Sequence, residues 1–179
     1  MSGYRHGGMK SVGKGRFKAR ALGLTTVLGM FFLFITGCAT DRVGIDLIEY
    51  INQGLLNTGD LEKNAVQHYS SVTGKNYTTD KRVYDALKEE VIPRYERFLQ
   101  LLMEIKPETD EVKRLNGMYI GGVRDLLRGL KVKMRAIEKN DQYLIREAND
   151  KIEKAVQEIG KWREELNRLS REHGVGMKK

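Results

Sequence analysis

Apolar residues that recur at steps of three and four constrain the fold of this chain more than any other feature. Three successive stretches between residues 79 and 175 carry this spacing. The last is close to a heptad repeat, in which Ile152, Ile159 and Leu166 recur every seventh residue. Such spacing places apolar side chains on one face of a helix. No segment alternates apolar and polar residues over the length of a strand, so we expect an all-α fold.

The first of these stretches ends at Pro107 and contains a second proline, Pro93. A proline inside a helix removes one backbone donor and crowds the preceding turn. Since the apolar spacing continues past Pro93, we expect a bend near Glu89 or Glu90 rather than the end of the helix.

Capping residues separate the two remaining stretches. Thr109, followed by two acids, predicts the start of a second long helix that stops near Asn140. Asp141 can cap the last helix, and Gly174 can end it in the left-handed conformation. Connections this short force neighbouring helices to run antiparallel. The sequence therefore predicts an up-down antiparallel helical bundle of three long helices over residues 79–175.

A shorter helical segment precedes the bundle. Within residues 38–78, the tetrapeptide Asn57-Thr58-Gly59-Asp60 reads as a break, after which Asp60 can cap a short helix that ends before Gly74. We expect residues 41–78 to pack against residues 79–175 as one domain, and whether they add a fourth helix is left open. The apolar residues at helical spacing before the break are Val43, Leu47, Ile48, Ile51, Leu55 and Leu56.

Residues 1–37 have the layout of a secretory signal. Six basic side chains and no acidic ones precede an apolar run, which extends over about fifteen residues from Ala21 to Ile35. A membrane-spanning helix needs about twenty apolar residues, so we expect cleavage rather than a permanent span. The start codon could be either Met1 or Met9.

The sequence Ile35-Thr36-Gly37-Cys38 follows this run directly. It resembles the lipobox of bacterial lipoproteins, in which an aliphatic residue and two small residues precede a cysteine. The resemblance implies cleavage between Gly37 and Cys38 and a diacylglycerol on the Cys38 thiol, with further acyl chains making membrane attachment persistent. The alternatives are an uncleaved signal anchor or an ordinary signal peptide with a chance cysteine.

The residue after the lipidated cysteine bears on localisation. Ala39 stands there, and the absence of aspartate at this position resembles lipoproteins that are sent to the outer membrane of Gram-negative bacteria. The resemblance implies an exported protein anchored to a cell membrane, and to the outer membrane facing the periplasm in a Gram-negative bacterium. The bacterial lineage cannot be read from the sequence.

The net charge of +8 does not indicate nucleic-acid binding. Six of the 32 basic side chains, and none of the 24 acidic ones, belong to residues 1–37, so the rest of the chain is nearly neutral. Binding to a phosphate backbone requires a concentrated positive surface. We therefore expect no nucleic-acid partner.

Residue patterns typical of catalysis or metal binding are missing from the sequence. Cys38 is the only cysteine, and the three histidines occur in no Glu-x-x-His or His-Glu-x-x-His pattern. We expect His68 and His173 to be structural or solvated. The sequence predicts no catalytic residue, no metal site and no cofactor.

Three glycines, Gly117, Gly121 and Gly122, lie inside the second long predicted helix. Each is about 1 kcal/mol less favourable there than alanine. One interpretation is close approach of another helix or a partner along Gly117 and Gly121, and the other is tight packing within the bundle against tyrosine or tryptophan. We expect Trp162, on the heptad stripe, to be part of the core.

Parts of residues 80–175, including Ile92-Pro93 and His173-Gly174-Val175, look like small helical lipoproteins of uncharacterised families. The function we expect is that of a membrane-anchored, non-enzymatic lipoprotein of the cell envelope that binds another protein or copies of itself. The alternatives are a helical bundle that binds a small ligand and an unrecognised envelope hydrolase. A polar cluster buried inside the bundle would favour these alternatives.

Overall fold

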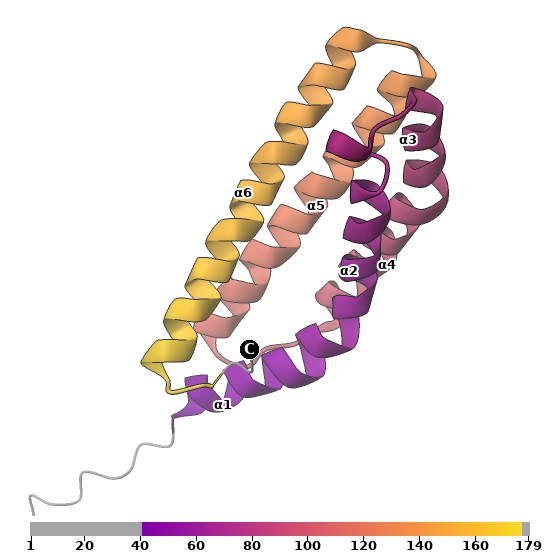
Figure 1. Ribbon diagram of the computed structural model, residues 1–179. Coiled ribbons are helices and arrows are strands. Elements are labelled where there is room, and N and C mark those ends of the chain that lie inside the picture. The colour runs from indigo at the N-terminus through magenta and orange to yellow at the C-terminus, as the bar shows by residue number, and fades with distance from the viewer. Residues whose placement is uncertain (1–40, 177–179) are drawn as a thin grey trace, which may run out of the picture. The chain divides into compact units, whose positions relative to one another are not determined.

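The computed structural model describes residues 41–176, and every regular element within them is a helix (Figure 1). The expected all-α class is confirmed. The predicted signal segment and the predicted lipidation and cleavage site at Gly37 and Cys38 lie outside the described residues. No helix among residues 41–176 is long and apolar enough to cross a membrane.

The first helical run consists of α1 (Arg42–Glu49), a π-helical turn η1 (Tyr50–Leu55) and α2 (Leu56–Ser70). The predicted break at residues 57–60 is wrong, and Asp60 lies inside α2 instead of capping it. The polar side chains there bond back to the preceding turn: the Thr58 hydroxyl donates to the Gly54 carbonyl at 3.1 Å, and Asn57 Nδ2 donates to the Gln53 carbonyl at 2.7 Å. The helix therefore continues without a new cap.

A second run follows a 3₁₀ turn η2 (Gly74–Asn76) and consists of α3 (Asp80–Ala86), a π-helical turn η3 (Leu87–Val91) and α4 (Ile92–Glu104). The irregularity expected before Pro93 takes the form of η3. Pro93 has no N–H to donate to the carbonyl of Glu89, and a widened turn accommodates the missing hydrogen bond.

The two longest helices are α5 (Asp110–Glu138) and α6 (Gln142–Glu172), which run antiparallel side by side (Figure 1). The predicted cap at Asp141 is confirmed, because its side chain accepts from the Leu144 N–H at 3.0 Å. Gly174 has φ +63°, so the predicted left-handed stop is confirmed as well.

Two glycines seven residues apart allow α5 and α6 to approach closely. A Cβ on Gly122 would lie 2.8 Å from Ile159 Cγ1, and a Cβ on Gly129 would lie 2.9 Å from Ile152 Cγ1. The heptad spacing thus places two small residues of α5 against two isoleucines of α6.

Residues 42–104 pack mainly against α5. α2 packs against α4, and α4 packs against α5, while α1 contacts α5 near its start. One core connects these helices, and Trp162 belongs to it with 6% of its surface exposed, as predicted. Only α5 and α6 are long, uninterrupted helices, so the finer expectation of an up-down bundle of three long helices stays a prediction.

Candidate functional site

Asp46, on α1, binds the start of α5. Its carboxylate accepts hydrogen bonds from the Thr109 N–H at 2.7 Å, the Thr109 hydroxyl at 2.6 Å and the Glu108 N–H at 3.0 Å. The side chain of Asp46 therefore fixes the two residues that lead into α5, although it comes from another helix.

Thr109 occupies the predicted N-cap position of α5, but its side chain accepts no hydrogen bond from the helix. The Thr109 hydroxyl instead donates to Asp46. Burial disfavours the ionised carboxylate of Asp46, but the hydrogen bonds from Thr109 and Glu108 outweigh this effect and lower its pKa. Asp46 is thus held as a charged group at the positive end of α5.

An open pocket of about 360 Å³ lies beside Asp46, between η1 and the end of α4. Glu49, Gln53 and Asn57 line one side of it, and Glu104 and Lys106 line the other. Lys106 Nζ donates to the backbone carbonyl of Met103 at 3.1 Å, close to the negative end of the α4 dipole. Acidic and amide groups outnumber basic ones on these walls, so the pocket suits ligands that donate hydrogen bonds.

Tyr50 connects this pocket to the core. It lines the pocket, yet only 2% of its surface is exposed. Burial raises the pKa of its hydroxyl, and the indole N–H of Trp162 lies close enough to oppose that rise. Neither of these two polar atoms has a hydrogen-bond partner of good geometry among the described residues.

A row of aromatic rings continues inward from Trp162. The rings of Trp162 and Tyr119 are stacked with centroids 3.7 Å apart and an interplanar angle of 5°. Phe98 meets Tyr119 edge to face at 5.7 Å, and Tyr95 meets Phe98 in the same way at 6.4 Å. These contacts link η1, α4, α5 and α6 through one buried row.

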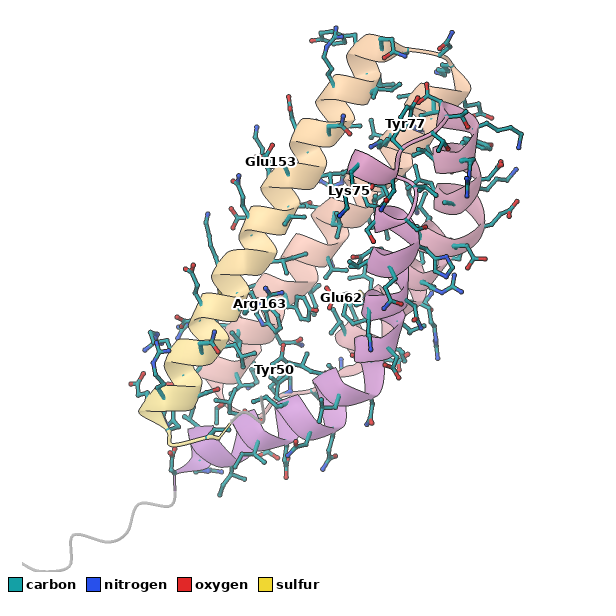
Figure 2. The ribbon with its side chains drawn as sticks, viewed as in Figure 1. Tyr50, Glu62, Lys75, Tyr77, Glu153 and Arg163 are labelled. Atoms are coloured by element: carbon teal, nitrogen blue, oxygen red, sulfur yellow. The ribbon has the colours of Figure 1, made fainter. Side chains whose placement is uncertain are left out.

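Glu62 on α2 adds a carboxyl group to this row. Figure 2 shows Tyr50 and Glu62 on the side of η1 and α2 that faces α5 and α6, and the Tyr119 hydroxyl donates to Glu62 Oε2 at 2.7 Å. Burial raises the pKa of Glu62, although the hydrogen bond from Tyr119 and the charge of Arg163 oppose the rise. Glu62, which is only partly buried, thus lies in a polar cluster with the buried tyrosines Tyr50, Tyr95 and Tyr119.

Both histidines of the described residues lie near carboxylates. The Nδ1 atom of His173 is 2.9 Å from both carboxylate oxygens of Asp41, and His68 Nε2 is 3.7 Å from a carboxylate oxygen of Glu90. Over residues 41–176, no group of three His, Cys, Asp or Glu residues is arranged to hold a metal ion. These histidines have ion-pair geometry at helix ends and edges.

The structure separates the three glycines that the sequence grouped together. A Cβ on Gly117 or Gly121 would meet nothing within 4 Å, so the expectation of tight packing against tyrosine or tryptophan is wrong for both. Gly122 does pack tightly, but against Ile159. Neighbouring positions of one helix point in different directions, which a run of glycines in the sequence does not distinguish.

Asp46, Glu62 and the pocket were not identified from the sequence. One signal in the sequence could have indicated Asp46: it stands directly before Leu47 in a segment of apolar residues at helical spacing. An acid in such a segment is unusual unless hydrogen-bond partners compensate for its burial. The partners of Asp46 are up to 63 residues away, so the sequence does not reveal them.

Comparison of the chain with models of protein families, with curated proteins and with solved structures finds no match.

Proposed function

We propose that the chain is the precursor of a bacterial lipoprotein, cut between Gly37 and Cys38 and held at a membrane by lipid on Cys38. The observation that carries the proposal is the order of a basic segment, a short apolar run and Ile35-Thr36-Gly37-Cys38. In support, α1 begins at Arg42, four positions after Cys38, so a lipid on Cys38 would hold the domain close to the membrane. With Ala39 after the cysteine, the proposed site in a Gram-negative bacterium is the outer membrane, facing the periplasm.

The proposed role of the domain is non-enzymatic: it binds another protein of the cell envelope or assembles with copies of itself. In support, the groups best suited to chemistry are engaged in internal contacts. Asp46 accepts from Thr109, His173 pairs with Asp41, and Glu62 accepts from Tyr119. Within this proposal α3, η3 and α4 behave as one bent helix, so that residues 80–172 act as an up-down bundle of three long helices.

The alternative is a bundle that binds a small polar ligand, and the pocket beside Asp46 favours it. The pocket walls carry Glu49, Gln53 and Glu104 close to the carbonyl end of α4, which would suit a cationic or amine-bearing ligand. In the cluster around Glu62, the carboxylate already accepts a hydrogen bond from Tyr119, so this alternative depends on the pocket rather than on the cluster.

Lipidation is tested by metabolic labelling of bacterial cells with an alkyne-bearing palmitate. Because Cys38 is the only cysteine, Cys38→Ser is a complete control. The wild-type protein should carry the label and a mature N-terminus at Cys38, and the variant should carry neither. An unlabelled wild-type protein that retains residues 1–37 would contradict the proposal.

The adaptor role is tested by crosslinking intact cells that express the wild-type protein or Cys38→Ser. We expect a defined envelope protein to be captured by the wild type and lost with Cys38→Ser. Self-crosslinks alone would favour assembly of the domain with copies of itself over binding of another protein. No crosslinks, or the same partner with both proteins, would contradict a membrane-tethered interaction role and direct attention to the pocket.

A further inference from the structure

The outward face of α1 and η1 is unusually poor in charge for this chain. Ile45, Ile48 and Leu56 are 50%, 45% and 67% exposed, respectively. The only charged members of this face are one base and one acid, which balance each other. The exposed residues of the face, at helical spacing, are Arg42, Ile45, Ile48, Glu49, Asn52, Gln53 and Leu56.

Exposed apolar residues elsewhere have different surroundings. Val156 on α6 is 54% exposed, but its exposed neighbours on the same helical face include Glu153 and Arg163, three residues before it and seven after it. A single apolar side chain among charges is ordinary on a protein surface, whereas several on one helical face mark a contact surface. Val156 therefore offers a matched control for Ile45 and Ile48.

The α1 face lies at the point where the tether joins the domain. Only Ala39, Thr40 and Asp41 separate Cys38 from Arg42, and an extended chain covers at most about 3.6 Å per residue, so these two residues lie within roughly 14 Å of each other. Asp41 is fixed to the domain, because it accepts from the Gly44 N–H at 2.9 Å and pairs with His173.

The position of α1 in the fold leaves this face outermost. α1 crosses the end of the domain where α5 begins and α6 ends (Figure 1). Its inner side is occupied by Leu47, which is fully buried, and by the Asp46 carboxylate bound to α5. A lipid on Cys38 would bring this end of the domain to the membrane, with Ile45 and Ile48 turned away from the core.

We infer that the face of α1 and η1 around Ile45 and Ile48 lies on the surface of the phospholipid bilayer to which Cys38 is anchored, and so fixes the orientation of the domain. This inference rests on the proposed lipidation. Two half-exposed isoleucines bind a bilayer weakly by themselves, but a tether of three residues makes their contact intramolecular. The charges of Arg42 and Glu49 balance each other, and the acids Glu108 and Asp110 lie beside Arg42. The attraction of this face to the bilayer is therefore apolar and does not depend on anionic lipid.

The experiment uses the purified full-length, lipidated protein in vesicles of phosphatidylcholine that contain a photoreactive phosphatidylcholine. After irradiation, the protein is digested with trypsin and the crosslinked peptides are identified by mass spectrometry. Trypsin releases residues 43–63, which contain Ile45 and Ile48, and residues 155–161, which contain Val156. We expect crosslinks to concentrate in residues 43–63 and to be unchanged between low and high salt. Ile45→Gln with Ile48→Gln should reduce them roughly tenfold, and Val156→Gln should leave them unchanged.

The same digest distinguishes failure of the inference from failure of the proposed lipidation. Equal crosslinking of residues 43–63 and 155–161 in a protein with lipid on Cys38, or no change with the double variant, overturns the inference and leaves the proposed function intact. An unmodified Cys38, in a peptide of residues 21–42 that retains the leader or in one of residues 38–42, overturns the proposed lipidation, and with it the inference. Unchanged circular dichroism of the double variant verifies that these exposed substitutions leave the fold in place.

Discussion

Thr109 donates both its backbone N–H and its hydroxyl to one carboxylate oxygen of Asp46, at 2.7 and 2.6 Å. The two residues are 63 positions apart, and Asp46 is 5% exposed. This contact joins the first helix of the domain to the start of α5. Because the Thr109 hydroxyl donates to Asp46, the Thr109 side chain accepts no hydrogen bond from the first turn of α5.

Replacing Asp46 by alanine should lower the free energy of unfolding by about 2–4 kcal/mol, because the N–H groups of Glu108 and Thr109 and the Thr109 hydroxyl would lose their charged acceptor. The fluorescence of Trp162, the only tryptophan, reports the urea transition. Asp60→Ala, an exposed acid of α2, is the control and should change stability by less than about 0.5 kcal/mol.

The same carboxylate should contribute to acid unfolding. The folded-state pKa of Asp46 is lowered, so its contribution to stability is present above its unfolded pKa and is lost as the pH falls through the folded value. Asp46→Asn should therefore be less stable than the wild type near neutral pH and approach it in strong acid. A constant difference between the two proteins at every pH would show that Asp46 is not held as an anion.

Glu62 should have the opposite dependence on pH. Its folded-state pKa is raised, chiefly by burial, so its protonated form is the one that favours folding, and its contribution is lost as the pH rises through the folded value. Glu62→Gln keeps an acceptor for Tyr119 without the charge and should be about 1 kcal/mol more stable than the wild type at pH 7. Near pH 4 the difference should vanish.

Glu153→Gln on the outer side of α6 provides the comparison for this variant (Figure 2). It should have no such pH-dependent gain in urea unfolding. A Glu62→Gln protein that is less stable than the wild type at pH 7 would mean that the carboxylate charge stabilises the core.

Two glycines of α5 should respond to alanine in opposite directions. Gly117→Ala should raise the free energy of unfolding by about 1 kcal/mol, because a Cβ there meets open space and alanine favours the helix. Gly122→Ala should lower it by about 1–3 kcal/mol, because its Cβ would lie 2.8 Å from Ile159 Cγ1 and 3.3 Å from the Ile159 backbone nitrogen. Thermal unfolding of both variants, which differ by five positions on one helix, checks the contrast.

Loss of the stacked pair in the core should be severe. Trp162→Ala removes the ring that stacks on Tyr119 and should reduce stability by about 3–5 kcal/mol in circular dichroism melts. Tyr143→Ala, at a position 72% exposed on the same helix, should have little effect. Similar melting temperatures for the two variants would contradict a core role for Trp162.

The helical class and most helix boundaries could be predicted from the sequence alone. Steps of three and four, the stop at Pro107, the cap at Asp141 and the left-handed Gly174 are local signals, since each depends on residues within a few positions of one another. The irregular turn before Pro93 was predictable for the same reason, because proline lacks the donor of its own turn. The predicted break before Asp60 was wrong because side chains there could bond to their own helix as readily as end it.

Which polar groups are buried and which small residues are in contact depends on the tertiary packing and could not be predicted from the sequence. Asp46 and Thr109, Glu62 and Tyr119, and Gly122 and Ile159 belong to different helices, and each pair depends on how those helices are rotated about their axes and shifted along them. Successive residues of a helix point about 100° apart. A Cβ on Gly122 would therefore contact Ile159, whereas a Cβ on the adjacent Gly121 would meet nothing within 4 Å. Such rotations are set by the packing of the whole core, which periodicity along the chain does not specify.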